Sequence, residues 1–317
     1  MEQITIQNQS LKLVCINYGA IVQKLLVKDK NGNETNVILG FKTPENYLNN
    51  PYFIGASIGR FAGRISDGGF DIDGKKYSIN HENGVHLHGG KITFAHQYWE
   101  VEEVNESEVP FVKFSYLSEH LEEGYPGNLK VYVTYKLKNN KLFITYEAET
   151  DQTTIVNLTN HNYYNLNGQG SVLNHQLELK SSQFLDIDEK QLATGKFNEV
   201  ANTPFDFNTK RKIGAHKNFN GIDDCFILNN KGHIATLYSN ESGIEMKVST
   251  NQPGVVIFTP KQLPEANYVN EVVGEYSSIC FETQNFPNAP NKSHFPSALL
   301  KKGDIYFNES EFEFLTK

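Results

Sequence analysis

Histidines and carboxylates that could transfer protons lie in five polar segments spread along the chain. These segments interrupt runs of alternating apolar residues, and they comprise residues 55–64, 86–90, 159–166, 221–226 and 281–291. Polar groups in such number are costly to bury unless they are paired, so they form either solvated loops or a site. Because binding faces on β scaffolds are usually assembled from separated loops, we expect the five segments to converge on one cleft.

The chemistry that these residue types support is proton transfer. A histidine can give a proton to a departing oxygen, and a carboxylate can take one from a hydroxyl group. His161 stands among asparagines and two tyrosines, while Glu282 precedes a proline-rich turn. The chain is also rich in aromatic side chains, with 16 Tyr and 21 Phe, which offer apolar faces for sugar rings. The residues alone therefore indicate a carbohydrate-type site with one histidine and one carboxylate.

A metal site has weak support in the sequence. His86 and His88 alternate along an expected strand, so both rings should point to one face with the spacing of metal ligands. The carboxylate that such a site would need three or four residues further on is missing, because Lys91, Ile92 and Thr93 occupy this region. We therefore expect both histidines to form hydrogen bonds, and we expect no metal and no organic cofactor.

Phosphate-loop and nucleophile chemistry are not expected either. The first segment lacks the G-x-x-x-x-G-K-[ST] pattern, so tight turns anchored by Arg60 and Arg64 are the simpler interpretation. The three cysteines, Cys15, Cys225 and Cys280, are far apart and form no C-x-x-C pair. We expect reduced and mostly buried thiols.

The elements that must position these residues are expected to be β-strands. Residues 129–137 alternate between apolar and polar types, residues 142–148 form a second run, and Asn139-Asn140 between them suits a tight hairpin turn. Similar short runs are found at residues 3–7, 11–17, 109–117, 174–180, 243–249 and 255–259. We expect no helix longer than about two turns and no βαβ spacing. Many short strands predict a sandwich or barrel, and we expect one all-β domain over residues 1–317.

The composition disfavours several classes of partner. The 317 residues contain 29 Lys and Arg against 37 Asp and Glu, a net charge of −8, whereas nucleic acids and anionic membranes recruit clustered basic residues. The first residues form no signal segment, and no stretch approaches the ~18 apolar residues of a membrane span. We therefore expect a cytoplasmic protein with a small-molecule partner, with no nucleic acid and no membrane, and as either a monomer or a homodimer.

The five segments resemble, in the same order, the motifs of the aldose 1-epimerase (galactose mutarotase) family. The family's G-A-x-x-G-R-x-A-x-R-I is matched by residues 55–65, its L-H-G-G by residues 87–90 and its T-N-H-x-Y-[FY]-N-L by residues 159–166. Its F-D-H-x-F is matched with differences by residues 222–226, and its E-T-Q-x-F-P-D-x-x-N by residues 282–291. The resemblance covers nearly the whole chain, and the T-N-H and E-T-Q motifs are specific.

The resemblance implies a fold and a set of roles. The fold is all-β, a large antiparallel β-sandwich with a sugar cleft on its concave face. The activity is that of an isomerase, an aldose 1-epimerase acting on a neutral hexose such as galactose or glucose. Glu282 would be the general base and His161 the general acid, while His88, Arg64 and Asp223 would hold the sugar hydroxyls and the ring oxygen.

Three further positions acquire meaning from the resemblance. Gln252 is a candidate for lining the cleft. Gly63 stands where many members of the family carry Asn, which removes one side-chain contact to a sugar, and Asp224 stands where many carry His. Both departures bear on sugar preference rather than on the chemistry.

The implied mechanism is acid–base ring opening without a cofactor. Ionised Glu282 would take the proton of the anomeric hydroxyl, and protonated His161 would give one to the ring oxygen. The ring would open to a free aldehyde, the C1–C2 bond would rotate, and closure would follow on the other face. We further expect Asp223, as a neighbouring carboxylate, to favour the charged form of His161.

Three other functions stay open at this point. A hexose-6-phosphate 1-epimerase of the same superfamily would need extra Lys or Arg at the cleft, and the net charge of −8 argues against it. A glycoside hydrolase would use two carboxylates, such as Asp223 and Glu282, on either side of a bond. A non-catalytic sugar-binding module would not need the pair of Glu282 and His161, both of which are present.

Overall fold

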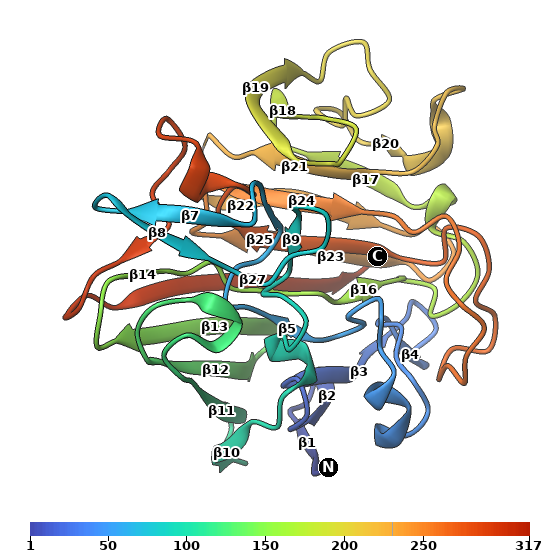
Figure 1. Cartoon of the computed structure of the whole chain (residues 1–317). Coiled ribbons are helices and arrows are strands. Elements are labelled where there is room, and N and C mark those ends of the chain that lie inside the picture. Colours follow the sequence, from blue (N-terminus) through green and yellow to red (C-terminus); the bar gives the residue numbers. More distant parts are fainter. Residues whose placement is uncertain (230) are drawn as a thin grey trace.

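The computed structural model describes residues 1–229 and 231–317, and its regular structure is almost entirely β-strand (Figure 1). The helical segments among these residues are short 3-10 turns of three to five residues. They are η1 (Pro44–Leu48), η2 (Phe94–His96), η3 (Glu122–Gly124), η4 (Val172–Asn174), η5 (Ile213–Ala215) and η6 (Ala289–Asn291). The prediction of a chain without long helices is confirmed.

A nine-stranded antiparallel sheet forms one layer of the molecule. Its strands, in spatial order, are β10 (Glu100–Asn105), β11 (Phe111–Ser118), β12 (Leu129–Lys138), β13 (Lys141–Thr150), β27 (Tyr306–Thr316), β23 (Ile244–Thr250), β22 (Gly232–Tyr238), β17 (Gln176–Leu179) and β20 (Arg211–Lys212). The predicted hairpin is confirmed as β12 and β13, and Asn139 at its turn has a φ of 54°. In Figure 1 the C-terminal strand β27 lies between β13 and β23 in the centre of this sheet.

A six-stranded antiparallel sheet forms the second layer. Its spatial order is β16 (Tyr163–Tyr164), β25 (Ile279–Gln284), β24 (Gly254–Phe258), β21 (Asp223–Ile227), β18 (Gln183–Ile187) and β19 (Ala193–Glu199). Side chains on one face of β24 and β25, among them Ile257 and Phe281, belong to the same buried core as Val248 and Phe312 of the nine-stranded sheet. The two sheets therefore pack face to face, and the predicted large antiparallel sandwich is confirmed.

The packing between the layers includes polar contacts as well as apolar ones. The rings of Tyr164 and Phe312 stack with their centroids 5.3 Å apart. The hydroxyl groups of Thr283 on β25 and Ser310 on β27 lie 2.6 Å from each other. Because alternate residues of a strand point to opposite faces, the other face of β25 is free to line a site.

Shorter strands surround the sandwich. A four-stranded sheet contains β1 (Gln3–Gln7), β2 (Leu11–Ile16), β3 (Ile21–Lys28) and β4 (Glu34–Asn36). Two-stranded pairs are formed by β5 (Ser57–Ile58) with β15 (Thr159–Asn160), β6 (Arg64–Ile65) with β9 (His86–Leu87), β7 (Gly69–Ile72) with β8 (Lys75–Ser78), and β14 (Thr154–Ile155) with β26 (Leu299–Leu300). The pair β6–β9 is important below because it brings two polar motifs of the sequence to one place.

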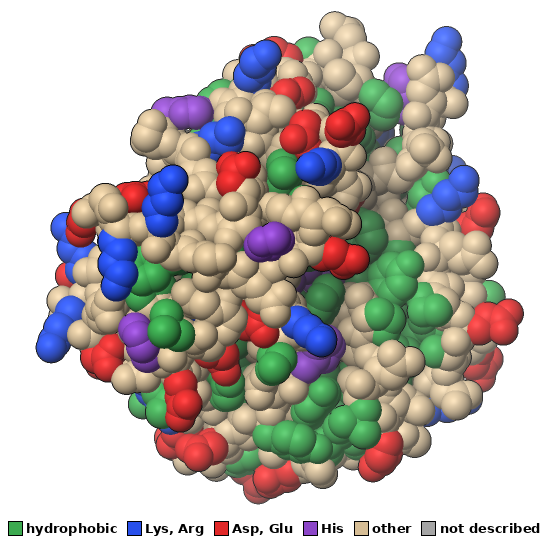
Figure 2. Space-filling view, in the orientation of Figure 1, with side chains coloured by type: hydrophobic (Ala, Val, Ile, Leu, Met, Phe, Trp, Pro, Cys, Tyr) green, Lys and Arg blue, Asp and Glu red, His purple; other side chains and the backbone are tan. Residues whose placement is uncertain are grey.

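The surface carries charges of both signs. On the face shown in Figure 2, acidic and basic side chains are interspersed rather than sorted into separate areas. None of the described helices has the length and apolar character needed to cross a membrane.

Candidate active site

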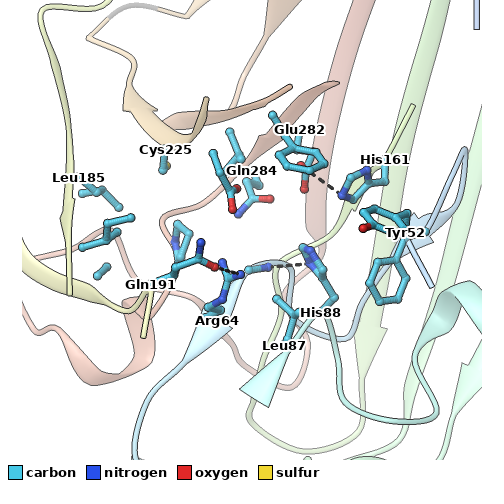
Figure 3. Close-up of a pocket in the computed structure, with 18 of the residues that line it drawn as sticks. Tyr52, Arg64, Leu87, His88, His161, Leu185, Gln191, Cys225, Glu282 and Gln284 are labelled. Atoms are coloured by element: carbon cyan, nitrogen blue, oxygen red, sulfur yellow. Dashed lines mark hydrogen bonds and ion pairs between the residues drawn. The ribbon is translucent and has the colours of Figure 1, made fainter. Parts of the chain in front are cut away.

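A cavity of about 230 Å³ lies over the outward face of the six-stranded sheet (Figure 3). All five polar sequence segments contribute to its wall: residues 55–64, 86–90, 159–166, 221–226 and 281–291. The predicted convergence of the segments is therefore found. The lining comprises Pro51, Tyr52, Phe53, Gly63, Arg64, Leu87, His88, His161, Tyr163, Leu185, Ile187, Gln191, Ala193, Asp223, Cys225, Val256, Phe258, Glu282, Gln284 and Pro287.

The register of the six-stranded sheet explains how distant residues meet in the cavity. Residues paired across antiparallel strands point to the same face, and so do residues two positions further along. One row across β21, β24, β25 and β16 consists of Asp223, Phe258, Cys280 and Tyr163. The next row consists of Cys225, Val256 and Glu282. Extending the β16–β25 register by two residues places His161 beside Glu282.

His161 and Glu282 form a buried acid–base pair in the cavity wall. Nε2 of His161 lies 3.4 Å from Oε1 of Glu282, and both side chains are almost fully withdrawn from solvent. The imidazole stacks on the ring of Tyr163 with centroids 5.0 Å apart, and Phe258 meets it edge-on. The pair is thus held in one orientation by its neighbours, with the cavity on its open side (Figure 3).

Burial dominates the protonation of this pair. Loss of solvent lowers the pKa of His161 to about 4. Burial also raises the pKa of Glu282 well above its ordinary value, and the nearby Asp223 carboxylate adds to this, whereas Arg64 opposes it. The expectation that the imidazole would be held in its charged form is wrong, because burial lowers the pKa of His161, whereas Asp223 raises that of Glu282.

His88 presents a fixed ring nitrogen to the cavity. The backbone N–H of Gly63 donates to Nδ1 of His88 at 3.1 Å, and the backbone N–H of His88 donates to the carbonyl of Gly63 at 3.0 Å. An amide N–H can only donate, so Nδ1 must accept, and the neutral ring carries its proton on Nε2. Burial lowers the pKa of His88 well below its ordinary value, which keeps the ring neutral. Its Nε2–H is therefore a hydrogen-bond donor.

The expectation that His86 and His88 share one face is wrong. His88 has a φ of 48°, which ends the strand and turns its side chain away from that of His86. His86 is buried outside the cavity, where its Nε2 lies 2.5 Å from the hydroxyl oxygen of Tyr125 and its Nδ1 lies 2.5 Å from the carbonyl of Asn80. Only His88 contributes to the site.

Arg64 enters the cavity from β6, and its side chain is held by a residue of a distant turn. One of its Nη atoms donates to Oε1 of Gln191, which lies in the turn between β18 and β19 (Figure 3). The guanidinium also opposes the burial-driven rise in the pKa of Asp223. Arg64 and Asp223 therefore place one positive and one ionisable acidic group on the cavity wall beside the acid–base pair.

A metal ligand set can be traced in the site, but its hydrogen bonds do not suit a metal. Ligand atoms of His88, His161 and Glu282 lie within 4.8 Å of one another. To bind a cation through Nε2, His88 would have to move its proton to Nδ1, where it would face the N–H of Gly63. The donor set therefore favours an organic ligand that accepts a hydrogen bond from His88.

Comparison with known proteins shows to which family the chain belongs. The model of the aldose 1-epimerase family matches residues 2–313. The chain belongs to the aldose 1-epimerase family. It is 38% identical to the galactose mutarotase of Sus scrofa over 325 residues, which covers 99% of this chain and 94% of the relative. The aldose epimerase homologue from C. elegans has a TM-score of 0.93 and 30% identity, with 99% of each chain covered. The galactose 1-epimerase from Lactobacillus acidophilus NCFM has a TM-score of 0.89 and 30% identity, covering 99% of this chain and 94% of that one.

The two departures from the aldose 1-epimerase pattern have different structural positions. Gly63 lines the cavity with a φ of +83°, and a Cβ atom there would come within 2.9 Å of Cγ of Pro287. Asp224 points to the opposite face from Asp223 and does not line the cavity. Its Oδ2 accepts from the backbone N–H of Asp223 at 3.2 Å, and burial raises its pKa to about 6.

Gln252, the remaining candidate, lies outside the cavity. Its amide nitrogen donates to Oδ1 of Asn251 at 2.7 Å, beside the carbonyl of Phe307. Arg60 also lies outside the cavity, as the turn-anchoring interpretation predicted. Its guanidinium donates to the carbonyls of residues 118, 126 and 127 at 2.9 to 3.0 Å.

Ser57 lies within residues 55–59, which read G-x-S-x-G, the pattern around many serine nucleophiles. Ser57 is fully buried on the short strand β5, and its hydroxyl lies 2.9 Å from that of Tyr146 and 3.2 Å from that of Tyr135. Neither the strand–turn–helix context nor an exposed hydroxyl is present. An expectation that no serine of the chain stands in this pattern is wrong for the sequence, but the position of Ser57 is not that of an exposed nucleophile.

Two residues at the site, Gln284 and Gln191, were not predicted from the sequence. Gln284 lines the cavity two residues beyond Glu282, and within the described chain its buried Oε1 has no hydrogen-bond partner. The alternation along β25 was the signal that could have found it. Gln191 lies in a turn with no distinctive motif, so only the tertiary structure reveals its contact with Arg64.

Proposed function

We propose that this protein is an aldose 1-epimerase, a mutarotase that interconverts the α and β anomers of a neutral hexose such as galactose or glucose. The observation that carries the proposal is the buried pair of His161 and Glu282, 3.4 Å apart on the wall of a sugar-sized cavity. Family membership and the names of the galactose mutarotase and galactose 1-epimerase relatives support it. Catalysis uses Glu282 and His161, while Arg64, His88 and Asp223 bind the sugar.

The reaction requires one proton to be taken and one to be given. Glu282 takes the proton of the O1 hydroxyl, the C1–O5 bond breaks, and His161 gives a proton to O5, so that a free aldehyde with a C5 hydroxyl forms. After rotation about the C1–C2 bond, the C5 hydroxyl attacks the other face of C1. His161 then takes back the proton of that hydroxyl, and Glu282 returns one to O1.

The proton count of the pair fits this cycle. Burial favours the uncharged form of both residues. Glu282 then carries its carboxyl proton, and His161 carries the single ring proton of a neutral imidazole. That arrangement holds the same number of protons as ionised Glu282 beside protonated His161. Transfer of one proton across the 3.4 Å contact therefore produces the reactive form without exchange with solvent.

The charges of the cavity favour a neutral sugar over its phosphate. Arg64 is the one Lys or Arg among the described lining residues, whereas Asp223 and Glu282 are both acidic groups. A phosphate group is usually held by several cationic or N–H donors. Apolar side chains, including Leu185, Ile187 and Val256, cover another part of the wall.

Polarimetry on freshly dissolved sugars tests the proposal. We expect the protein to accelerate the loss of optical rotation of α-galactose or α-glucose, and to act more weakly on the 6-phosphates. Glu282→Gln and His161→Gln should each reduce kcat by roughly 10²–10⁴-fold with an unchanged circular dichroism spectrum, because each removes one acid–base group. Full activity in either variant would contradict the assignment of roles, and release of reducing sugar from a disaccharide would indicate hydrolysis instead.

A further inference from the structure

The Nδ1 edge of His161 faces a buried thiol. While Nε2 of this imidazole faces Glu282, its Nδ1 lies 3.6 Å from Sγ of Cys280. Cys280 is inaccessible to solvent and stands two residues before Glu282 on β25, so both side chains point to the same face. One strand therefore supplies a contact to each nitrogen of the imidazole.

A thiol differs from the other groups that commonly orient a histidine. Its S–H is a weak donor and its sulfur a weak acceptor, so it can serve either form of the ring. A carboxylate can only accept, and a backbone amide can only donate, as that of Gly63 does to His88. Burial raises the pKa of Cys280 well above its ordinary value, so the thiol keeps its proton and both abilities.

We propose that Cys280 is a positioning residue for His161: its sulfur accepts from Nδ1–H, which keeps the proton of the neutral ring on Nδ1 and leaves Nε2 free to exchange protons. The inference rests on the proposed function, because in the epimerase cycle His161 gains and loses its proton at Nε2, the nitrogen that faces Glu282. Because Nδ1 carries a proton in both the neutral and the charged ring, one acceptor holds the imidazole in place throughout the cycle. Tyr163, stacked on the ring, fixes its plane, and Cys280 fixes its rotation within that plane.

Two substitutions separate hydrogen bonding from packing. Cys280→Ser keeps a group that both donates and accepts, and we expect kcat within about threefold of the wild type. Cys280→Ala removes the partner and leaves Nδ1 buried without a hydrogen bond, so we expect kcat to fall about tenfold with KM within about twofold. If the thiol only filled space, the buried hydroxyl of the serine variant would be tolerated no better than alanine.

Cys15→Ala is the matched control. Cys15 is also fully buried, but it lies in the core on β2, away from the cavity. We expect this variant to lose stability, as removal of a buried sulfur should cause, and to keep the wild-type kcat. Unfolding curves of all three variants then show whether a fall in kcat accompanies destabilisation in general or only the loss of Cys280.

Nitrogen NMR of His161 supplies a measurement that does not depend on turnover. We expect a single fixed tautomer of the neutral imidazole in the wild type and in Cys280→Ser, and an averaged signal from two tautomers in Cys280→Ala. Wild-type kcat together with a fixed tautomer in the alanine variant would overturn the inference, and so would equal impairment of the serine and alanine variants. If the wild type fails to accelerate mutarotation, the proposed function is wrong, while the tautomer comparison still decides the role of Cys280.

Discussion

Arg64 and Gln191 show how one side chain of the site depends on another from a distant loop. Arg64 is supplied by β6, and Gln191 by the turn between β18 and β19, 127 positions further along the chain. Arg64→Ala should lower kcat/KM by roughly 10²-fold, because a charge-assisted contact to the sugar is lost. Gln191→Ala should raise KM a few-fold with kcat nearly unchanged, since Arg64 remains but is less well held. Steady-state polarimetry of both variants measures these effects.

The double variant provides the control for that prediction. If Gln191 acts through Arg64, removal of Gln191 should have no further effect once Arg64 is alanine, so the two effects should not add. Additive losses in the double variant would mean that Gln191 contacts the sugar independently.

At the scale of elements, the turn that precedes β6 sets the donor state of His88. Gly63 has a positive φ, contacts Pro287, and exchanges two backbone-mediated hydrogen bonds with His88. Gly63→Ala should lower the free energy of unfolding by about 1–2 kcal/mol, because an L-residue is strained at this φ. It should also raise KM, since a shift of the turn moves the N–H that fixes His88. Chemical denaturation and polarimetry measure the two effects.

A substitution at Gly74 serves as the comparison. Gly74 also has a positive φ of 81°, but nothing lies within 4 Å of its added Cβ, and it stands in the β7–β8 hairpin away from the cavity. Gly74→Ala should cost similar backbone strain and leave KM unchanged. Equal KM values in the two variants would show that the turn at Gly63 does not determine how His88 binds the sugar.

Elements with strong local patterns were predictable, and those defined by distant contacts were not. Strict alternation predicted the hairpin of β12 and β13, and similar runs predicted β1, β2, β23 and β24 within about two residues at each end. The pair β6–β9 has only two residues in each strand, too few for a periodic signal. The positive φ of His88 follows from its contacts with the Gly63 turn, and for this reason the sequence pattern wrongly grouped it with His86.

The site could be predicted as a set of residues but not as a geometry. Glu282, His161, His88, Arg64 and Asp223 were expected together, and all five line the cavity. Their protonation was not predictable, because the pKa values depend on how completely the sandwich excludes water from them. The positions of Gln252 and Gln191 depended on the packing of loops, for which the sequence offers no rule.

At the scale of the whole molecule, we propose that the chain is one domain, as the sequence predicts. The main apolar core includes Ile4 of β1 and Phe314 of β27, and β27 lies between β13 and β23, so the chain ends are bound into one structure. Thermal unfolding should therefore show one transition by calorimetry and by circular dichroism. Two separated transitions would indicate independent domains.

The same experiment at different pH values tests the buried histidines. His175 is fully buried outside the cavity, its Nε2 accepts from the N–H of Leu166 at 3.0 Å, and burial lowers its pKa to about 4. The unfolded state, with an ordinary histidine pKa near 6.5, binds the proton first as the pH falls. This histidine therefore contributes stability above pH 6.5 that is lost between about pH 6.5 and pH 4, and the loss is at most about 3 kcal/mol.

His175→Gln isolates that contribution from the carboxyl groups. Glutamine offers Leu166 an acceptor without a titrating group, so the free energy of unfolding of this variant should fall less between pH 7 and pH 4 than that of the wild type. The opposite trend is expected from Asp224, whose raised pKa of about 6 makes the folded state bind its proton first. Identical pH slopes in wild type and variant would show that His175 is not buried in neutral form.

The alternation along β25 has a consequence for how this protein can change over evolutionary time. Phe281 and Thr283 face the layer interface, while Glu282 and Gln284 on the other face line the cavity and Cys280 lies buried on that same face. Replacing any one of them alters one face only. Inserting or deleting a single residue within the strand would exchange the two sets, so that the carboxylate entered the core and the phenyl ring entered the cavity. Catalysis and folding thus depend on the same alternation of side chains along β25. We expect length variation among related chains to be confined to the loops on either side of this strand.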